Sequence, residues 1–158
     1  MISKSTFSFI PKGRSEIYSA GGTQIAILET AFLPKTEYKL NFNDEELILK
    51  RISKASWNES VVLDKSGTEI MKFKAEKYTW INDKILFGSL TTKKSEYQSL
   101  SDKLGNLSVV KKGQKEPCLE FTFEDRETIF DSNELTLKEA ICLRILVQKV
   151  YKPTALCH

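Results

Sequence analysis

The feature that most constrains how this chain can fold is its C-terminal segment, residues 137–151, which is apolar on almost every side. It is preceded by Thr136-Leu-Lys-Glu139, the pattern of a capping box. In this motif the Thr136 hydroxyl accepts from the Glu139 amide, while the Glu139 carboxylate accepts from the Thr136 amide. The pair predicts a helix that begins directly after Thr136. Pro153 predicts its end, because the residue before a proline disfavours helical geometry.

At about 100° per residue, this helix presents apolar side chains in nearly all directions. A helix packed on one face of an open sheet would leave Ile141 and Ile145 in water, at a loss of roughly 1.5–3 kcal/mol each. We therefore predict that strands surround the helix on more than one side. The main apolar side consists of Ala140, Leu143, Leu146, Val147, Val150 and Tyr151, and the opposite side carries Ile141, Cys142 and Ile145.

The chain before this helix has the pattern of a series of β-hairpins. Each hairpin combines alternating apolar and polar residues with a short acidic turn. In one of them Asp64 can bond its own backbone, and Gly67 accepts a positive φ. The clearest hairpins are residues 39–50, 60–74 and 119–131. The predicted fold is therefore mainly β with one helix (α+β): an antiparallel meander that closes into a barrel around or against the C-terminal helix.

The domain boundaries follow from the length and from the turn-forming residues. At 158 residues the chain suffices for one domain with a substantial core. Residues 1–22 are interrupted by Pro11 and three glycines, which predicts an irregular N-terminal arm with at most one edge strand. Residues 23–158 are predicted to form a single β-rich domain that ends with the helix at about 137–151. Within it, residues 95–105 change to an apolar spacing of three and four, which predicts a short amphipathic helix.

The residue types that common catalytic sites need are not in a usable arrangement. The only histidine is the terminal His158, so His-based triads, Cys-His dyads and His-ligated metal sites are not expected. Cys118, Cys142 and Cys157 are odd in number and widely spaced, which predicts neither a disulfide framework nor a zinc site. No phosphate-binding glycine loop is present. We expect no catalytic residue, no metal and no cofactor.

The cysteines, the N-terminal residues and the longest apolar stretch together indicate where in the cell the protein is located. Three unpaired cysteines are typical of the cytoplasm. The N-terminal residues lack the apolar core of a signal peptide. The longest apolar stretch, 140–147, is interrupted by Arg144 and is far shorter than the roughly 20 residues that cross a bilayer. We expect a cytoplasmic protein that meets a membrane, if at all, only peripherally.

Two groups of residues have a functional and a structural interpretation. Glu124, Asp125 and Glu127 cluster, but a solvated turn accounts for them better than a catalytic pair. Trp57 and Trp80 could stack on a ligand, but tryptophans within alternating strands usually supply core area. We predict a turn and two core residues.

The net charge of +3 is unevenly distributed. Residues 93–115 hold six lysines against two acids, and residues 116–139 hold eight acids against two basic residues. Such neighbouring blocks usually form solvated faces that meet in the fold, although they could also steer a partner. Lysines on a wet strand face, such as Lys72 and Lys74, could contact phosphate or could protect an edge strand from aggregation.

One hairpin, Val61-Val-Leu-Asp-Lys-Ser-Gly-Thr-Glu-Ile-Met-Lys-Phe-Lys74, and the apolar helix that follows later resemble a known family. This combination is similar to the tubby C-terminal-like superfamily, which includes the plant LURP-one-related proteins and the phospholipid scramblases. The resemblance covers roughly residues 23–152 as architecture and implies a closed barrel that encircles a central hydrophobic helix. No cysteine-rich lipidation segment or calcium-binding segment of the scramblases is matched, so lipid transport is not implied.

The resemblance further implies a binding module that meets anionic phospholipid headgroups through lysines. The candidate ligand-binding residues are Lys72, Lys74, Lys111 and Lys112. The preferred hypothesis is thus a non-catalytic intracellular binding module for anionic headgroups or for a protein partner. We expect no nucleic acid partner, and the oligomeric state stays open.

Two alternatives remain. A lipocalin-like carrier would hold a small hydrophobic ligand inside the barrel, with the helix packed outside. An enzyme based on carboxylates alone would use the cluster around Asp125.

Overall fold

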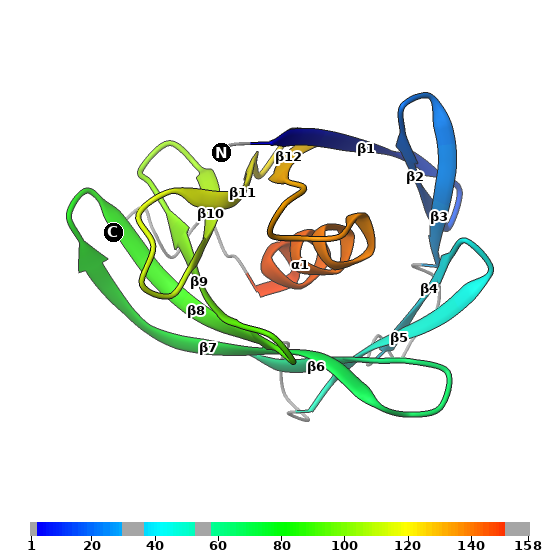
Figure 1. The fold of residues 1–158 in the computed structure, drawn as a ribbon, viewed down its shortest axis with the longest axis horizontal. Coiled ribbons are helices and arrows are strands. Elements are labelled where there is room, and N and C mark those ends of the chain that lie inside the picture. Colours follow the sequence, from blue (N-terminus) through cyan, green and yellow to red (C-terminus); the bar gives the residue numbers. More distant parts are fainter. Residues whose placement is uncertain (1–2, 30–36, 53–57, 151–158) are drawn as a thin grey trace.

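In the computed structural model, which describes residues 3–29, 37–52 and 58–150, the strands form a closed antiparallel barrel around one helix (Figure 1). Each strand pairs with its neighbours in sequence, and β1 pairs with β12 to close the barrel. Among the described strands, this closure gives each one a neighbour on both sides. The predicted mainly β barrel with a C-terminal helix is confirmed. The elements are β1 Lys4–Lys12, β2 Ser15–Ala20, β3 Thr23–Glu29, β4 Glu37–Phe42, β5 Glu45–Arg51, β6 Glu59–Leu63, β7 Glu69–Ile81, β8 Lys84–Thr92, β9 Glu96–Ser101, β10 Asn106–Lys111, β11 Pro117–Thr122, β12 Glu127–Asp131 and α1 Leu137–Val150.

The prediction of an irregular N-terminal arm over residues 1–22 is wrong. Residues 4–20 form β1 and β2, and β1 is the strand that closes the barrel, with Lys4 opposite Asp131 and Ser8 opposite Glu127. Pro11 and the glycines do not break these strands, because they lie near strand ends or in the turns between them. Gly13 adopts a φ of 60° in the β1–β2 turn.

The short helix predicted within residues 95–105 is also wrong, since this segment contains β9 and the turn after it. Tyr97 and Ser99 are both buried on β9, and the Ser99 hydroxyl donates to the carbonyl of Gly88 at 3.1 Å. A buried serine hides the strand alternation in the sequence, because it reads as polar. Leu104, which suggested a helical spacing, lies in the exposed β9–β10 turn.

The predicted hairpins are confirmed. Asn43 and Asp44 form the β4–β5 turn with φ of 45° and 66°, a backbone region that Asn and Asp tolerate better than most residues. In the β6–β7 turn the Asp64 carboxylate accepts from the amides of Ser66 and Thr68. Hydrogen bonds from these residues lower the pKa of Asp64.

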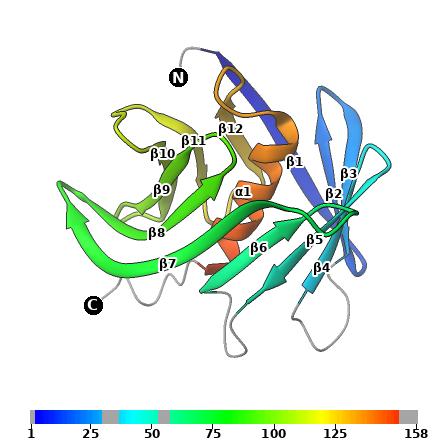
Figure 2. The ribbon, with the colours of Figure 1, turned by 60° about the horizontal axis from the view of Figure 1, so that its bottom comes forward.

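The helix α1 occupies the middle of the barrel (Figure 2). Its capping box forms as predicted: the Thr136 amide donates to Glu139 Oε1 at 2.9 Å, and the Glu139 amide donates to Thr136 Oγ1 at 3.1 Å. Ile141 is 0% exposed and Ile145 is 3% exposed, so strands do cover both sides of the helix. Pro153, which was predicted to end it, lies outside the described residues. So do Trp57, Cys157 and His158.

Because the strands alternate in direction, their turns alternate between two ends of the barrel. The amino end, where α1 begins, carries the β2–β3, β4–β5, β6–β7, β8–β9 and β10–β11 turns. The carboxyl end, toward which α1 runs, carries the β1–β2, β7–β8, β9–β10 and β11–β12 turns. In the described ranges no helix is long and apolar enough to cross a membrane.

Candidate functional site

The interior of the barrel is occupied by the helix. The core includes the helical residues from Ala140 to Val147 and inward-facing residues of the strands. Among these inner strand residues are Phe7, Leu28, Leu49 and Phe73. The lumen is therefore packed with protein side chains, and any partner that the described part of the chain binds meets the outer surface.

Arg144 is a charged residue that lies fully buried within this largely apolar interior. Its guanidinium donates to the carbonyl of Asp125 at 2.5 Å, to the Thr128 hydroxyl at 2.9 Å and to Gln148 Oε1 at 3.0 Å. The same group stacks over the ring of Phe121, with its carbon 3.9 Å from the centroid. Burial lowers its pKa to about 10, so the guanidinium remains charged at neutral pH.

These contacts connect the helix to the β11–β12 turn. Arg144 holds the backbone of Asp125 and, at 3.4 Å, that of Glu127 from the inside of the barrel. The Asp125 and Glu127 side chains are exposed on the other side of this turn. Arg144 therefore positions a turn whose outer side belongs to a groove on the barrel surface.

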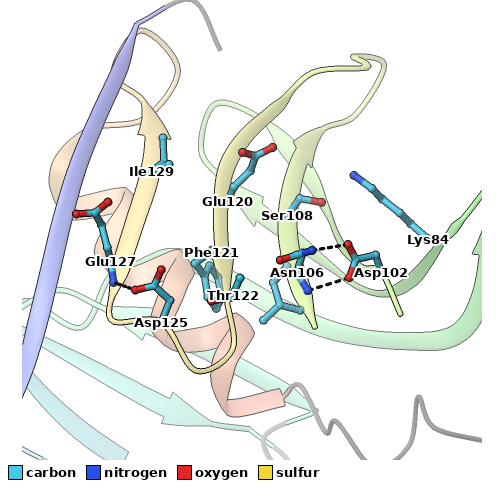
Figure 3. Close-up of a pocket in the computed structure, with 11 residues that line it drawn as sticks. Lys84, Asp102, Asn106, Ser108, Glu120, Phe121, Thr122, Asp125, Glu127 and Ile129 are labelled. Carbon is cyan, nitrogen blue, oxygen red and sulfur yellow. Dashed lines mark hydrogen bonds between the residues drawn. The ribbon is translucent and has the colours of Figure 1, made fainter. Parts of the chain in front are cut away.

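This groove lies on the outer face of β10–β12 and has a volume of about 390 Å³ (Figure 3). Its lining includes outward-facing residues of adjacent strands: Ser108 on β10, Glu120 on β11 and Ile129 on β12. The groove is completed by Lys84, Asp102, Asn106, Thr122, Asp125 and Glu127, with Leu107 and Phe121 contributing apolar surface.

The charge of the groove is negative. Four carboxylates line it, against the single ammonium of Lys84. Asp102 is engaged in its own turn, where it accepts from the amides of Leu104 and Asn106 at 2.8 and 2.9 Å. Burial by itself raises the pKa of Asp102, but the hydrogen bonds from Asn106 and Leu104 outweigh it, so that the pKa is lowered. Asp102 is thus a turn-forming carboxylate that stays ionised.

The other three carboxylates differ in how they are used. Asp125 Oδ1 accepts from the Glu127 amide at 2.9 Å, which shapes the β11–β12 turn. The carboxylates of Glu120 and Glu127 have no hydrogen bond or ion pair with any residue that the structure describes. These two groups are the ones available to a partner. The third acid of the predicted cluster, Glu124, does not line the groove.

Ser108 is the least expected residue of the groove. It is only 5% exposed, and its hydroxyl oxygen has no hydrogen-bond partner among the described residues. In Figure 3 this hydroxyl points toward the side of the groove on which Lys84 lies. A buried polar group without a partner costs about 1–3 kcal/mol, so a ligand that bonds this hydroxyl would recover part of that loss.

A second surface feature adjoins the groove at the carboxyl end of the barrel. Tyr78, Trp80 and Ile81, on the β7–β8 hairpin, and Leu104, in the β9–β10 turn, are exposed and form what we call the hairpin-tip patch. Leu104 is 87% exposed and Trp80 is 57% exposed. The ammonium of Lys103 lies 5.6 Å from the centroid of a Trp80 ring. The same two hairpins carry Lys84 and Asp102 of the groove.

The prediction that Trp80 is a core residue is wrong. Trp80 lies on β7, a strand of 13 residues whose pairing with β8 shifts between Ala75 and Thr79. Met71 and Phe73 of this strand face the interior, but every residue from Glu76 to Ile81 is exposed. The end of β7 therefore extends beyond the core, and its side chains meet solvent on both faces.

The four lysines predicted to bind ligand lie in two separate pairs. Lys72 and Lys74 are on β7. Lys111 ends β10 and Lys112 follows it in the turn, three strands or roughly 14 Å away from β7. Lys74 is exposed. The other three form ion pairs at 3.3–3.5 Å: Lys72 with Glu59, Lys111 with Glu134, and Lys112 with Glu96. The Lys111–Glu134 pair joins the basic and the acidic segment, as expected for solvated faces that meet.

The groove was not predicted from the sequence, although the sequence contains part of the pattern that forms it. The alternation around Leu119 and Phe121 places Glu120 on the outer face. No sequence pattern showed that Ser108 and Lys84, 12 and 36 positions before Glu120, would line the same depression, because strand register decides this.

In the described ranges no group of three or more His, Cys, Asp or Glu side chains is placed to hold a metal ion. No protein-family model, curated protein or solved structure matches this chain.

Proposed function

We propose that this chain is a non-catalytic binding module that recognises a protein partner through the outer surface of β7–β12. The observation that carries this proposal is the hairpin-tip patch, in which large apolar side chains are gathered at one end of the barrel. Large apolar side chains that are exposed close together at one end of a fold commonly mark interaction surfaces. Aromatic residues such as Trp80 and Tyr78 are enriched among the residues that dominate binding energy.

The packed lumen favours an outer-surface binding module over a carrier of an internal ligand. A carrier needs an internal cavity, whereas α1 fills the interior with buried side chains. This counts against a lipocalin-like carrier. The helix and barrel act instead as a rigid scaffold that presents hairpins on its outside.

The surroundings of the patch favour a protein over an anionic membrane. The neighbouring groove carries four carboxylates and one lysine, and like charge would repel an anionic lipid surface. A protein partner with apolar residues and a basic segment suits both features. We place this partner in the cytoplasm, where the free thiols of Cys118 and Cys142 stay reduced.

Site-specific photo-crosslinking tests the proposal. A benzophenone amino acid at Leu104 should give one dominant cross-linked product in cells of the source organism. The same amino acid at Glu46, exposed on β5 next to the turn at the amino end, should not give it. The substitution Trp80→Ala should remove the product, because it removes the largest side chain of the patch. Equal products from both positions, or a product that persists in Trp80→Ala, would refute this binding surface.

One observation favours a second candidate, the recognition of anionic phospholipid headgroups. A pocket of about 240 Å³ at the amino end is lined by Lys93, Lys94 and Lys138, together with Thr136 and Glu139. Lys138 also forms an ion pair with Glu45 at 3.2 Å, so Lys93 and Lys94 are the lysines that carry this candidate. Lysines near a membrane surface contribute about 1 kcal/mol each toward anionic lipid. The resemblance to the tubby C-terminal-like superfamily supports this function too. On the basis of this resemblance we propose that the chain is a member of that superfamily.

Co-sedimentation with vesicles at low salt tests this second candidate. Phosphatidylcholine vesicles that contain phosphatidylserine should bind the protein, and vesicles without it should not. Charge reversal in Lys93→Glu/Lys94→Glu should abolish binding, whereas Lys74→Glu, on the barrel wall, should weaken it less. Absence of binding at low salt, where electrostatic attraction is strongest, would end the lipid hypothesis.

A further inference from the structure

We propose that the groove on β10–β12 binds a basic side chain of the partner, an arginine or a lysine, together with a neighbouring backbone carbonyl. This inference rests on the proposed function, because it names the chemistry of the partner at the same surface. It is carried by two independent observations: the uncompensated carboxylates of Glu120 and Glu127, and the unpartnered buried hydroxyl of Ser108.

The carboxylates form the cation side of the groove. Glu120 on β11 and Glu127 at the start of β12 line the same depression, on neighbouring strands. A concave surface lined by one sign of charge concentrates its field, so these carboxylates attract a cation more strongly than isolated surface acids. The planar guanidinium of arginine can donate to two carboxylates at once and is weakly hydrated, which favours arginine over lysine.

Ser108 and Lys84 form the donor side of the groove, where the carboxylate of Asp102 is already engaged by the amides of its own turn. The Ser108 hydroxyl points toward the side of the groove where Lys84 lies, and Lys84 supplies an ammonium there. An approaching cation would be repelled by this ammonium, whereas a carbonyl oxygen could accept from both groups. The groove thus has an acidic side and a donor side, an arrangement that suits a basic residue in an extended segment.

The β11–β12 turn, which leads to Glu127, is held in place from inside the barrel. Arg144 fixes the carbonyls of Asp125 and Glu127, so the backbone that carries the Glu127 carboxylate is supported by the buried helix. Preorganised charges lose less free energy on binding than mobile ones. The groove is therefore a built surface on a rigid element.

The test uses two small probes and the whole folded chain. Acetyl-Gly-Arg-Gly-amide is titrated into ¹⁵N-labelled protein, and acetyl-Gly-citrulline-Gly-amide serves as its neutral isostere. The arginine peptide should shift the amide signals of Ser108, Glu120 and Glu127, and the citrulline peptide should bind roughly tenfold more weakly, since a charge-assisted hydrogen bond is lost. Shifts that are absent, spread over the surface or equal for both peptides would overturn the inference.

Matched variants assign the two sides of the groove. The double substitution Glu120→Gln/Glu127→Gln should remove the preference for arginine over citrulline. Ser108→Ala should weaken both peptides by a similar factor, because it removes the bond to the carbonyl and leaves the carboxylates in place. Glu46→Gln/Glu69→Gln, at exposed glutamates outside the groove, should change neither affinity.

Each variant must retain the dispersed amide spectrum of the folded protein, so that a loss of binding cannot come from unfolding. An unchanged arginine preference in Glu120→Gln/Glu127→Gln would sink the proposal. The outcome is separable from that of the proposed function, because peptide binding is measured without the partner. A cross-link at Leu104 without arginine binding would support the proposed binding module. It would also show that the groove is not the site for a basic residue of the partner.

Discussion

Cys142 illustrates how the enclosed helix governs the chemistry of single residues. Its thiol is fully buried in the centre of the barrel, and burial raises its pKa from 9.0 to about 12. A thiol with such a pKa is almost wholly protonated at neutral pH and is neither a nucleophile nor a metal ligand. The expectation that Cys142 is a small core residue is confirmed by its burial.

The raised pKa of Cys142 predicts a specific pH dependence. Above pH 9 the unfolded chain loses this proton while the folded chain keeps it, so the thiol contributes stability that is complete below pH 9 and disappears toward pH 12. One such proton changes the free energy of unfolding by about 1.4 kcal/mol per pH unit. In Cys142→Ala, stability should fall less steeply between pH 9 and 12, by up to this amount.

Urea unfolding at a series of pH values measures this difference. Below pH 8, one unit under the ordinary thiol pKa of 9.0, the two proteins should show parallel curves, which serves as the internal control. Curves that stay parallel up to pH 12 would show that the thiol titrates alike in the folded and unfolded states.

The residue scale is also where prediction from sequence was weakest. Trp80 and Ser108 were misjudged or overlooked, because their exposure depends on where β7 leaves the barrel and on the register of β10. Ile141 and Ile145, in contrast, were predicted to be buried from their helical positions alone, and both are. A residue's face within an element can be read from spacing, but its exposure beyond the core cannot.

At the scale of elements, Arg144 couples α1 to the β11–β12 turn. Methionine at this position would keep contact with the rings of Phe9 and Phe121 but would leave the carbonyls of Asp125 and Glu127 without their donor. We predict that Arg144→Met lowers the free energy of unfolding by about 2 kcal/mol, since the loss of its charge-assisted hydrogen bonds, including the one to the buried Thr128 hydroxyl, outweighs the removal of one desolvated charge.

Chemical denaturation measures the stability of Arg144→Met, and amide hydrogen exchange locates the change. Exchange should accelerate at residues 125–128 before it does elsewhere. Arg144→Lys is the matched control: it keeps the charge, cannot donate to every acceptor, and should be intermediate. A variant Arg144→Met that equals or exceeds the native stability would mean that the arginine does not hold the turn.

The elements themselves were predictable where local chemistry defines them. The capping box, the Asp64 turn and the acidic hairpins depend on residues close in sequence, so their pattern is visible in the chain. β1 was not recognised, because it pairs with β12 across 119 to 127 residues, from Ser8 opposite Glu127 to Lys4 opposite Asp131. β2 was not recognised either, because it pairs with β1 and β3 and so depends on β1 being a strand. β9 was not recognised, because its inward positions include serines, which sequence periodicity counts as exposed. The groove, which depends on four strands at once, lay beyond the reach of such patterns.

At the scale of the whole molecule, the barrel and its helix depend on each other. α1 contributes Ile141, Leu143, Ile145, Leu146 and Val147 to the core, all buried. At roughly 1.5–3 kcal/mol for each side chain, their burial is worth on the order of 10 kcal/mol. This equals the entire net stability of a typical domain, about 5–15 kcal/mol. The strands alone would surround an empty apolar lumen.

We therefore predict that a chain ending at Glu134, which lacks α1, does not fold. Its amide spectrum should show the narrow dispersion of an unfolded chain, and its thermal scan should lack a cooperative transition. A separate peptide of residues 135–158 added in trans should restore dispersion, because it returns the same side chains to the lumen. If instead the shortened chain folded alone, its barrel would enclose an apolar cavity. The carrier hypothesis, which the packed lumen now argues against, would then regain its physical basis.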